Sequence, residues 1–490
     1  MLHNNTCSIS CQNPKKKILP PYSPEHNPNR HKQNIEGRSQ TCCPIVREKI
    51  SYFRGAFRYP ISFHIDSIPA VTKGEKQVVV IGGGLIGFST AYQLLKRGLR
   101  VTVIERGMEM EASCSTGNAG MVVPSHFVPL AAPGMIWKGI RWMFDPESPF
   151  AIRPRPSWEL VSWGWKFYRA SSPARVKRAM PVLRDMALRS RTMFAELAET
   201  EGFEFGLEKK GLLMLCKTRA ALGHEAEIVA TANTLGVDAE LLDAEGVRKK
   251  DPAIEMDVCG GVYFAQDCHL DPARFLNNLR QEVRRLGGAI LWGAEVNGFR
   301  QSGARLEAAI LKSGEEISGD EFVLCGGAWS PSVGKKLGLN LPMQAGKGYS
   351  VTHPNPAALP SICSLLSEAR VAVTPMGGKL RIGGTMEIVG LDESVNRRRL
   401  NGILKSVGAY FPQLAETDFG GLEVWKGLRP CSPDGMPYIG RAASRENVVI
   451  ATGHSMLGLS LSPVSGEMVA DLITGAAMKY DMALLDPDRY

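Results

Sequence analysis

The stretch QVVVIGGGLIGFSTAYQLLKRGLRVTVIER, residues 77–106, decides the fold. Residues 77–81 are mainly valine and isoleucine and predict a buried strand. Residues 88–97 carry apolar side chains at helical spacing and end at Gly98, and residues 100–106 predict a second strand. A strand, a glycine turn, a helix and a second strand in this order form one unit of a parallel α/β sheet.

Three glycines of the turn form the pattern G-x-G-x-x-G, which in this position predicts a dinucleotide site. Gly82 permits a sharp turn, Gly84 lets the backbone approach a pyrophosphate, and Gly87 lets the helix pack against the sheet. Glu105 ends the second strand, where a carboxylate accepts hydrogen bonds from ribose hydroxyls and repels the 2′-phosphate of NADP. The candidate contacts from this unit are Gly82, Gly84, Leu85, Ile86, Gly87, Glu105 and Arg106. The unit alone leaves FAD and NAD both open.

The composition is that of a globular protein with a sizeable core. Of the 490 residues, 44% are hydrophobic and 22% are charged. At about 150 residues per domain, this length predicts roughly three domain-sized units. No stretch approaches the roughly 18 uncharged apolar residues that a membrane-spanning helix needs.

The first 75 residues differ from the rest and predict a disordered basic extension. Residues 1–74 hold 11 Lys and Arg against 4 Asp and Glu, whereas the remaining residues hold 47 against 45. The extension weakly resembles an organelle transit peptide, but a dispensable segment or a start codon placed too far upstream explains it better. Because the body is almost neutral, we expect no nucleic-acid partner.

The eleven cysteines are spaced too irregularly to predict a disulfide framework. Cys7, Cys11, Cys42 and Cys43 fit no standard spacing of zinc ligands. We therefore expect reduced thiols in a reducing compartment, and no metal site.

Three further segments predict an extended cofactor. Residues 113–126, SCSTGNAGMVVPSH, are polar and rich in glycine, which is typical of a loop beside a large ligand. Strands predicted at 322–325 and 447–452 both run into glycines, and a helix is expected to begin near Gly458 after the second strand. Glycine-ended strands so far apart in the sequence predict a ligand that crosses a whole domain.

Seven segments resemble the D-amino-acid oxidase superfamily of FAD-dependent oxidoreductases, and most closely its D-amino-acid dehydrogenase branch. They are VVVIGGGLIGFSTAYQL (78–94), SCSTGNAG (113–120), DCHLDPARF (267–275), AGKGYS (345–350), GGTMEIVG (383–390), WKGLRPCSPDGMPYIG (425–440) and ATGHSMLGLSLS (451–462). Together they extend over roughly residues 76–480. The resemblance implies that the dinucleotide is FAD.

The resemblance also implies an α/β architecture with two domains: a doubly wound Rossmann-type FAD domain built from discontinuous segments, and a mixed-sheet α+β substrate domain. We place the FAD domain at 76–125, 258–342 and 420–490, and the substrate domain at 126–257 and 343–419. The chain agrees locally with this plan. Asp271 and Pro272 predict the start of a helix, and a Met-Gly-Gly turn at 376–378 predicts a hairpin.

The resemblance and the glycine-rich segments extend the candidate cofactor contacts. They add Ser113, Ser115, Asn118, Ala119, Gly120, Val296, Gly326, Trp329, Gly453, Gly458, Leu459 and Ser460. Some relatives hold FAD through a cysteine in the neighbourhood of Cys431. The local pattern RPCSPDG resembles the dehydrogenase version instead, so we expect non-covalent FAD.

The resemblance gives Arg429, in GLRP, the role of a clamp for the substrate carboxylate. A planar guanidinium makes two parallel hydrogen bonds and so fixes which face of Cα meets the flavin. Tyr349 is a candidate second donor or lid, with a half-buried core tyrosine as the alternative. Lys347 is either structural or near the flavin, and His454 either lines the site or is simply hydrogen-bonded in place.

The implied reaction is the oxidation of a D-amino acid. Hydride leaves Cα for the flavin, the amine becomes an imine, and water hydrolyses the imine to a 2-oxo acid and ammonia. The electrons then pass to a quinone or another carrier. Alternatives with the same fold are a D-proline or D-hydroxyproline dehydrogenase and a glycine or sarcosine oxidase. An alternative of another class is a flavin-binding subunit without catalysis.

Residues 135–168 contain five of the eight tryptophans, interleaved with lysine and arginine. Either these rings pack beneath the substrate domain, or they anchor the protein on a membrane surface or a partner. We expect the protein in the cytoplasm. The second interpretation would place it peripherally on the inner face of the membrane.

Overall fold

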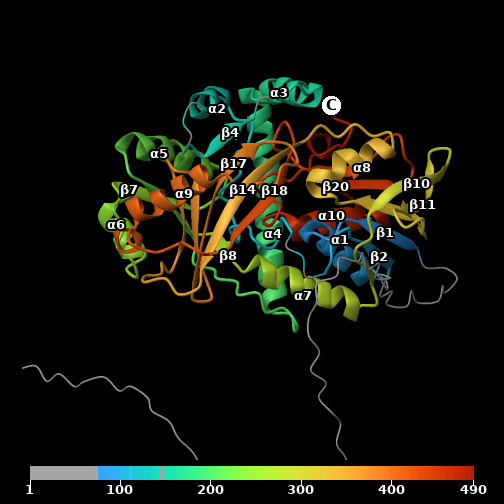
Figure 1. Cartoon of the computed structure of the whole chain (residues 1–490), viewed down its shortest axis with the longest axis horizontal. Coiled ribbons are helices and arrows are strands. Elements are labelled where there is room, and N and C mark those ends of the chain that lie inside the picture. The colour runs from blue at the N-terminus through green and yellow to red at the C-terminus, as the bar shows by residue number, and fades with distance from the viewer. Residues whose placement is uncertain (1–75, 110, 112, 144, 146, 154) are drawn as a thin grey trace, which may run out of the picture. The chain divides into compact units, whose positions relative to one another are not determined.

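The computed structural model describes residues 76–490, except 110, 112, 144, 146 and 154 (Figure 1). The extension predicted at 1–75 lies outside the described residues. Within the described part, two large sheets lie in different halves of the body (Figure 1). A search of the same part finds no helix that combines the length and apolarity needed to cross a membrane.

The first large sheet has six strands in the order β19-β20-β13-β1-β2-β9. Their bounds are β1 Gln77–Ile81, β2 Arg100–Ile104, β9 Ala289–Leu291, β13 Glu321–Leu324, β19 Tyr438–Arg441 and β20 Val448–Thr452. All neighbours in this sheet are parallel except β19 and β20. The chain thus winds outward from β1 in both directions, which confirms the doubly wound α/β fold.

The six-stranded sheet is covered on both faces. The helices on one face are α1 Leu85–Lys96, α7 Pro272–Arg285 and α10 Ser462–Thr474. The other face is covered by α8 Ser330–Lys336 and a three-stranded sheet of β10 Val296–Ser302, β11 Arg305–Leu311 and β12 Glu316–Ser318. Because side chains alternate along a strand, Val78 and Val80 lie in the core under the helices, and Val79 and Ile81 lie in the core on the other face. This double burial is why residues 77–81 form a continuous apolar run.

The second large sheet has nine strands and is mixed, as predicted. Eight of them follow the order β18-β14-β17-β16-β15-β5-β7-β6, and β4 pairs with β17. Their bounds are β4 Phe150–Ile152, β5 Leu212–Cys216, β6 Ala239–Asp243, β7 Gly260–Phe264, β14 Gln344–His353, β15 Cys363–Leu366, β16 Val371–Met376, β17 Lys379–Ile388 and β18 Val424–Cys431. Pairs β15·β5 and β17·β4 are parallel, and the other neighbours are antiparallel. The Met-Gly-Gly turn joins β16 to β17 as expected.

Two strands pair differently from the segment to which the sequence assigned them. β7 and β18 fall in the ranges given to the FAD domain, but they pair with β5 and β14 of the nine-stranded sheet. Strand pairing depends on partners far away in the sequence, which the local pattern does not show. We therefore propose domain boundaries after residues 264 and 431.

The two predicted helix starts have different outcomes. Asp271 caps α7 as predicted, with its carboxylate accepting hydrogen bonds from the N–H groups of Ala273 and Arg274 at 2.9 and 3.3 Å. The helix expected near Gly458 was placed wrongly, because α10 begins at Ser462. Residues 457–461 form hydrogen-bonded turns first, and a proline then opens the helix at its first turn.

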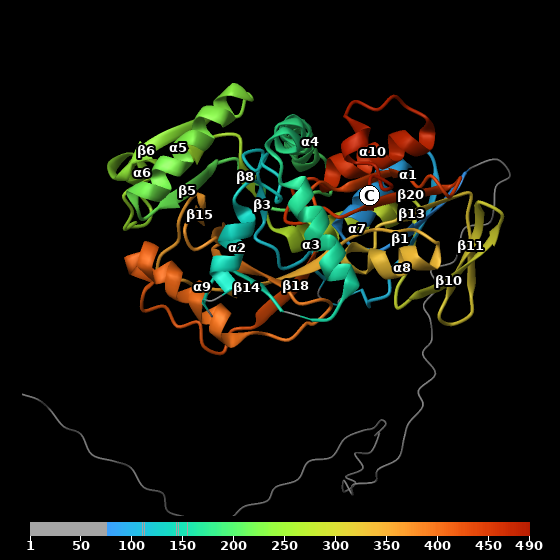
Figure 2. The ribbon, with the colours of Figure 1, turned by 90° about the horizontal axis from the view of Figure 1, so that it is seen from above.

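The remaining elements lie outside the two large sheets and the three-stranded sheet. They are α2 Met135–Met143, α3 Trp158–Ala170, α4 Pro173–Ala198, α5 Arg219–Thr234, α6 Ala244–Lys250, α9 Arg397–Tyr410, the short strands β3 Met121–Val122 and β8 Cys268–His269, and the 3₁₀ turns Gly327–Trp329, Pro412–Leu414 and Met482–Leu484. Helices α2 and α3 lie next to each other on one side of the body in both views (Figure 1 and Figure 2).

Of the five tryptophans in residues 135–168, Trp163 is buried and Trp142 is partly buried. Trp137, Trp158 and Trp165 are exposed, so the packing interpretation is wrong for these three.

Candidate active site

The glycine turn after β1 forms a cradle at the start of α1. Gly82 has a φ of 116°, and a Cβ on Gly87 would lie only 1.8 Å from the carbonyl oxygen of Gly82. Gly84 is the N-cap residue and brings no capping side chain. The Leu85 N–H donates to Ser115 Oγ at 3.1 Å, and the N–H of Ile86 belongs to a first turn that has no intrahelical acceptor. Such a helix start attracts phosphate.

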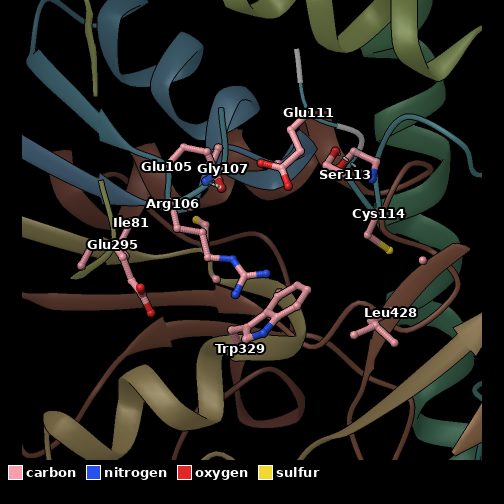
Figure 3. Close-up of a pocket in the computed structure, with 18 of the residues that line it drawn as sticks. Ile81, Glu105, Arg106, Gly107, Glu111, Ser113, Cys114, Glu295, Trp329 and Leu428 are labelled. Atoms are coloured by element: carbon pink, nitrogen blue, oxygen red, sulfur yellow. Dashed lines mark hydrogen bonds between the residues drawn. The ribbon is translucent and has the colours of Figure 1, made fainter. Parts of the chain in front are cut away.

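The end of β2 supplies the expected carboxylate. Glu105 accepts a hydrogen bond from the Gly83 N–H at 2.6 Å through Oε2, and one from the Gly107 N–H at 2.8 Å through Oε1. Its position at the mouth of the cradle is therefore fixed from both sides. The Arg106 guanidinium lies over the ring of Trp329 with 3.7 Å between the charge centre and the ring centroid (Figure 3).

A cavity of about 370 Å³ extends from this cradle to the edge of the nine-stranded sheet (Figure 3). At the first end it is lined by predicted cofactor contacts: Gly82, Gly84, Glu105, Arg106, Ser113, Ser115, Val296, Gly326 and Trp329. At the second end it is lined by Lys347 and by residues 424–428 of β18. The cradle, the Glu105 carboxylate and a continuous cavity between the two sheets fit an extended dinucleotide such as FAD.

Several predicted cofactor contacts shape the walls without lining the cavity. Asn118 holds the loop 113–120 together, because its Nδ2 donates to the Ser115 carbonyl at 2.7 Å and its Oδ1 accepts from the Gly120 N–H at 2.8 Å. The carbonyl of Ala119 accepts a hydrogen bond from Thr374 of the nine-stranded sheet at 2.8 Å. Leu85, Ile86 and Gly87 belong to α1. Their part in the site is to support the cradle.

The second glycine-ended strand, β20, also lies away from the cavity. Gly453, Gly458, Leu459 and Ser460 do not line it. Ser460 Oγ instead accepts from the Val123 N–H at 3.2 Å and donates to the Met121 carbonyl at 3.1 Å. It thereby fixes β3, which follows the loop 113–120.

His454 is packed against α10. Its Nε2 lies 2.9 Å from Ser465 Oγ, and its Nδ1 is buried with no partner among the described residues. Burial lowers the pKa of this imidazole to about 3, so the ring is neutral at physiological pH. The structure does not bring His454 to the cavity.

Tyr349 and Lys347 together anchor the loop between β17 and α9. The Tyr349 hydroxyl donates to Glu387 Oε1 at 2.8 Å and accepts from the Asn396 N–H at 3.0 Å. Lys347 Nζ donates to the Ser394 carbonyl at 2.6 Å. Burial raises the pKa of Tyr349, so its hydroxyl stays protonated. The loop that these two residues hold includes Glu393, which lines the cavity.

Arg429 lies on β18 directly after the cavity-lining Leu428. It does not itself line the cavity, but its charge acts on the thiol of Cys114, which does. Its Nη1 donates to the Thr385 carbonyl at 2.8 Å, and no carboxylate lies within ion-pair distance of it among the described residues. Burial lowers the pKa of this guanidinium, which still remains protonated at any physiological pH. A partly buried cation without a counter-ion favours the binding of an anion from outside the chain.

The backbone around Arg429 is strained at two positions. Thr385 and Ser455 have φ angles of 67° and 50°, and they are two of the three non-glycine residues with positive φ in the described part of the chain. The Thr385 carbonyl accepts the hydrogen bond from Arg429, and the Ser455 N–H donates to the Pro430 carbonyl at 2.9 Å. Strain of this kind persists where the surroundings hold a functional group in place.

Sequence reasoning missed Cys114 and Trp425, which both line the cavity near Arg429. Trp425 Nε1 donates to the Ser113 carbonyl at 3.2 Å, so β18 is tied directly to the loop 113–120. Burial raises the pKa of the Cys114 thiol to about 11, although nearby Arg429 acts to lower it. Cys114 lies between the predicted contacts Ser113 and Ser115, and Trp425 begins the quoted motif that contains Arg429; this was the signal available. Arg280 and Trp292 also line the cavity, and the sequence gives no signal for them.

The chain matches a family of known proteins over most of its length. The family model described as DAO, FAD dependent oxidoreductase, matches residues 77–472. The D-amino acid dehydrogenase of Granulibacter bethesdensis is 33% identical over 426 residues, which cover 84% of this chain and 99% of that protein. The D-amino acid dehydrogenase of Xanthobacter autotrophicus is 32% identical over 419 residues, with 84% and 99% covered.

Solved structures show the same fold. Glycine oxidase from Geobacillus kaustophilus superposes with a TM-score of 0.68 at 23% identity, covering 85% of this chain and 99% of that chain. L-proline dehydrogenase from P. horikoshii gives a TM-score of 0.64 at 22% identity, with 85% and 97% covered. The fold and the superfamily predicted from the sequence are both confirmed, and the chain belongs to the DAO family of FAD dependent oxidoreductases.

Proposed function

We propose that the protein is an FAD-dependent dehydrogenase that converts D-amino acids to 2-oxo acids and ammonia and passes the electrons to a quinone or another carrier. The observation that carries this proposal is the environment of Arg429. Its guanidinium is partly buried near Cys114, at the end of the cavity formed by β18, and its only hydrogen-bond acceptor in the described chain is a backbone carbonyl. The carboxylate of an amino acid supplies the missing counter-charge.

The protein's own residues orient the substrate in this scheme. Thr385 occupies one N–H of Arg429, and the remaining N–H groups of the planar guanidinium are left for the two oxygens of a carboxylate. A bidentate contact fixes the substrate's rotation, so that one face of Cα points into the cavity. Trp425 and the loop 113–120 close the cavity next to this point, which keeps water from the reacting carbon.

The cofactor is held by the residues of the cradle. The start of α1 would hold the pyrophosphate, Glu105 the ribose hydroxyls, and the wall around Val296 the adenine end. Bound FAD supplies the hydride acceptor, which the protein's side chains lack. We propose that it is bound without a covalent link, because Cys431 does not line the cavity. Precipitation with acid should release all the yellow colour into the supernatant.

The choice of D-amino acids rests on the relatives, two of which are called D-amino acid dehydrogenases. The fold by itself does not make this choice, since a glycine oxidase and an L-proline dehydrogenase share it. D-proline, D-hydroxyproline, glycine and sarcosine therefore remain alternative substrates to be tested alongside D-amino acids.

The decisive experiment is anaerobic bleaching of the flavin absorption by a panel of D- and L-amino acids, D-proline, D-hydroxyproline, glycine and sarcosine. We expect a D-amino acid to bleach the flavin at least tenfold faster than its L-enantiomer. Bleaching by glycine or sarcosine alone, or by none of the compounds, would overturn the proposal. Oxygen consumption with peroxide release as fast as reduction of a quinone analogue would replace the dehydrogenase with an oxidase.

A further inference from the structure

Helix α3 is apolar on two opposite sides. Leu160, Trp163, Phe167 and Ala170 recur at spacings of three and four residues and face the core. Trp158, Val161, Trp165 and Tyr168 recur with the same spacing, and their exposed fractions are 79%, 59%, 61% and 61%. The first stripe is sufficient to attach the helix to the body. The second stripe therefore requires a different explanation.

Helix α2 extends this apolar surface. Trp137 is 77% exposed, and Ile140 and Met143 are each 41% exposed. Of the eleven large apolar side chains exposed in the described part of the chain, seven lie on α2 and α3. The two helices are neighbours on one side of the body (Figure 1 and Figure 2). We call the seven side chains on α2 and α3 the α2–α3 face.

Positive charge gathers around the α2–α3 face. Residues 135–178 contain nine Lys and Arg against three Asp and Glu, whereas the rest of the body, residues 75–134 and 179–490, contains 38 against 42. Arg141, Arg169 and Lys177 are exposed, and within the described residues none of them forms an ion pair. The net charge of the body thus changes sign at this segment.

We propose that the α2–α3 face docks onto the surface of a bilayer that contains anionic lipids. Tryptophan and tyrosine prefer the boundary between headgroups and acyl chains, and lysine and arginine next to them bind anionic headgroups. A second copy of this chain would bring the same positive charge against itself, so self-association through this face is disfavoured. The seven side chains stand on the outer surfaces of two helices, which suits a bilayer better than the pocketed surface of a protein partner.

The α2–α3 face is connected to the active site through one helix. Trp163 Nε1, on the inner side of α3, donates to the Cys431 carbonyl at 2.9 Å, and Cys431 is two residues from Arg429. Strand β4, between α2 and α3, pairs with β17 at Met386, next to the Thr385 that binds Arg429. A helix is about 10 Å across, so docking would hold the substrate end of the cavity close beneath the headgroups. A quinone dissolved in the lipid would then lie close to the substrate end of the cavity. This last link rests on the proposed function, whereas the docking does not.

Vesicle flotation of the full-length holoenzyme tests the proposal. The vesicles are phosphatidylcholine alone, or phosphatidylcholine with about a third phosphatidylglycerol. We expect binding to the mixed vesicles and a loss of at least tenfold in the double variant W158S/W165S. In the charge variant R141E/R169E/K177E, binding to the mixed vesicles should fall about fivefold or more for each reversed residue. High salt should weaken binding of the wild type.

Matched variants keep the test specific. Leu241→Ser removes an exposed apolar side chain on the nine-stranded sheet, and Lys379→Glu reverses an exposed charge at the start of β17 in that sheet; both should bind like the wild type. All variants keep residues 1–74, so the basic extension contributes equally to each measurement. No binding by the wild type, equal binding by W158S/W165S, or a dimer that W158S/W165S abolishes would each overturn the proposal.

A second readout separates docking from the proposed function. Reduction of a water-soluble dye by an amino acid should be unchanged in W158S/W165S, since these residues are outside the cavity. Reduction of quinone embedded in vesicles should fall in the same variant. If no amino acid reduces the flavin but flotation behaves as expected, the proposed function fails and the docking surface stands.

Discussion

Two arginines, one with a buried side chain and one partly buried, have opposite surroundings in two regions of the molecule. Arg489, near the end of the chain, makes two hydrogen bonds to the Asp434 carboxylate at 2.9 and 3.0 Å, and both side chains are under 5% exposed. Arg175 adds a further bond to Asp434 at 2.8 Å. Arg429 has only the Thr385 carbonyl. Burial of a charge is tolerated in the first region because the chain supplies the counter-ion.

The difference separates a structural charge from a binding charge. At Arg489 all parts of the interaction are present in the folded chain, so its loss should affect stability. At Arg429 the described chain supplies no counter-ion, so the loss of this arginine should weaken the binding of a ligand. Asp434 and Arg429 are only five residues apart along the sequence. Proximity in the chain therefore says nothing about which role a buried charge has.

The largest effect is expected for Arg429→Met. Without the guanidinium, the substrate carboxylate would be buried without a partner, and the rate constant for flavin reduction divided by the substrate Kd should fall about 10³-fold. Thermal stability should be unchanged or higher, because an uncompensated buried charge is removed. Stopped-flow reduction and a melting curve measure both quantities. Arg429→Lys should recover part of the rate, and equal rates for wild type and Arg429→Met would refute the clamp.

The next effect is expected for Arg489→Met. Removing Arg489 leaves the buried Asp434 with only the partly exposed Arg175 as its partner, so the free energy of unfolding should decrease by about 3 kcal/mol. Denaturant titration followed by tryptophan fluorescence measures this loss. Flavin reduction in the protein that remains folded should keep the wild-type rate. A variant that keeps full stability but loses activity would reverse the roles given to the two arginines.

A third buried charge, Asp267, sharpens the comparison through pH. Its carboxyl has no ion-pair partner in the described chain, and burial raises its pKa to about 7 although Ser125 Oγ donates a hydrogen bond to it. The unfolded chain loses this proton near pH 4, whereas the folded protein keeps it up to about pH 7. Stability should therefore fall as pH rises through this window.

Asp267→Asn should remove that fall. Between pH 5 and pH 8 we expect the wild type to lose about 2 kcal/mol more stability than Asp267→Asn. Asp434→Asn is the matched control, with the opposite sign. Burial acts to raise the pKa of Asp434, but Arg489 and Arg175 hold it below its usual value, so its contribution is lost as pH falls. Parallel pH profiles for wild type and Asp267→Asn would contradict the buried protonated carboxyl.

The smallest effect is expected for Tyr349→Phe. The hydroxyl holds the loop with Glu393 and does not line the cavity, so its loss should raise the KM for the amino acid by about fivefold and leave kcat unchanged. Steady-state kinetics separate the two parameters. If Tyr349 instead donated to the substrate carboxylate, the fall in kcat/KM would approach that of Arg429→Met.

The nucleotide half of the site was predictable because its determinants are local. Gly82, Gly84 and Glu105 are set by one strand, one turn and the next strand, and their spacing alone predicts their roles. The whole α/β class follows from the same residues 77–106. Val296, Gly326 and Trp329 were also placed at the cavity, because each follows or begins a strand that the sequence shows clearly.

The substrate half depends on pairings that the sequence does not display. Tyr349 meets Glu387 and Asn396 only because β14 pairs with β17. β18 joins the nine-stranded sheet because its partner is β14, although β19 follows it closely in the chain and joins the other sheet. His454 follows a strand that ends in glycine, as the cradle does, but its ring turns toward α10. In each case the deciding contact is far away in sequence.

The strand order of the six-stranded sheet has a consequence for biosynthesis. β1 and β2 leave the ribosome early, but β1 finds its second neighbour only in β13, and β13 finds its own in β20. A nascent chain that stops before Val448 already has the complete glycine turn and still lacks an outer part of the sheet that supports it. Until β20 is synthesised, the apolar strands of the incomplete sheet stay exposed. The nascent chain is therefore prone to aggregation and depends on chaperones. Loading with FAD is therefore expected to follow translation rather than accompany it.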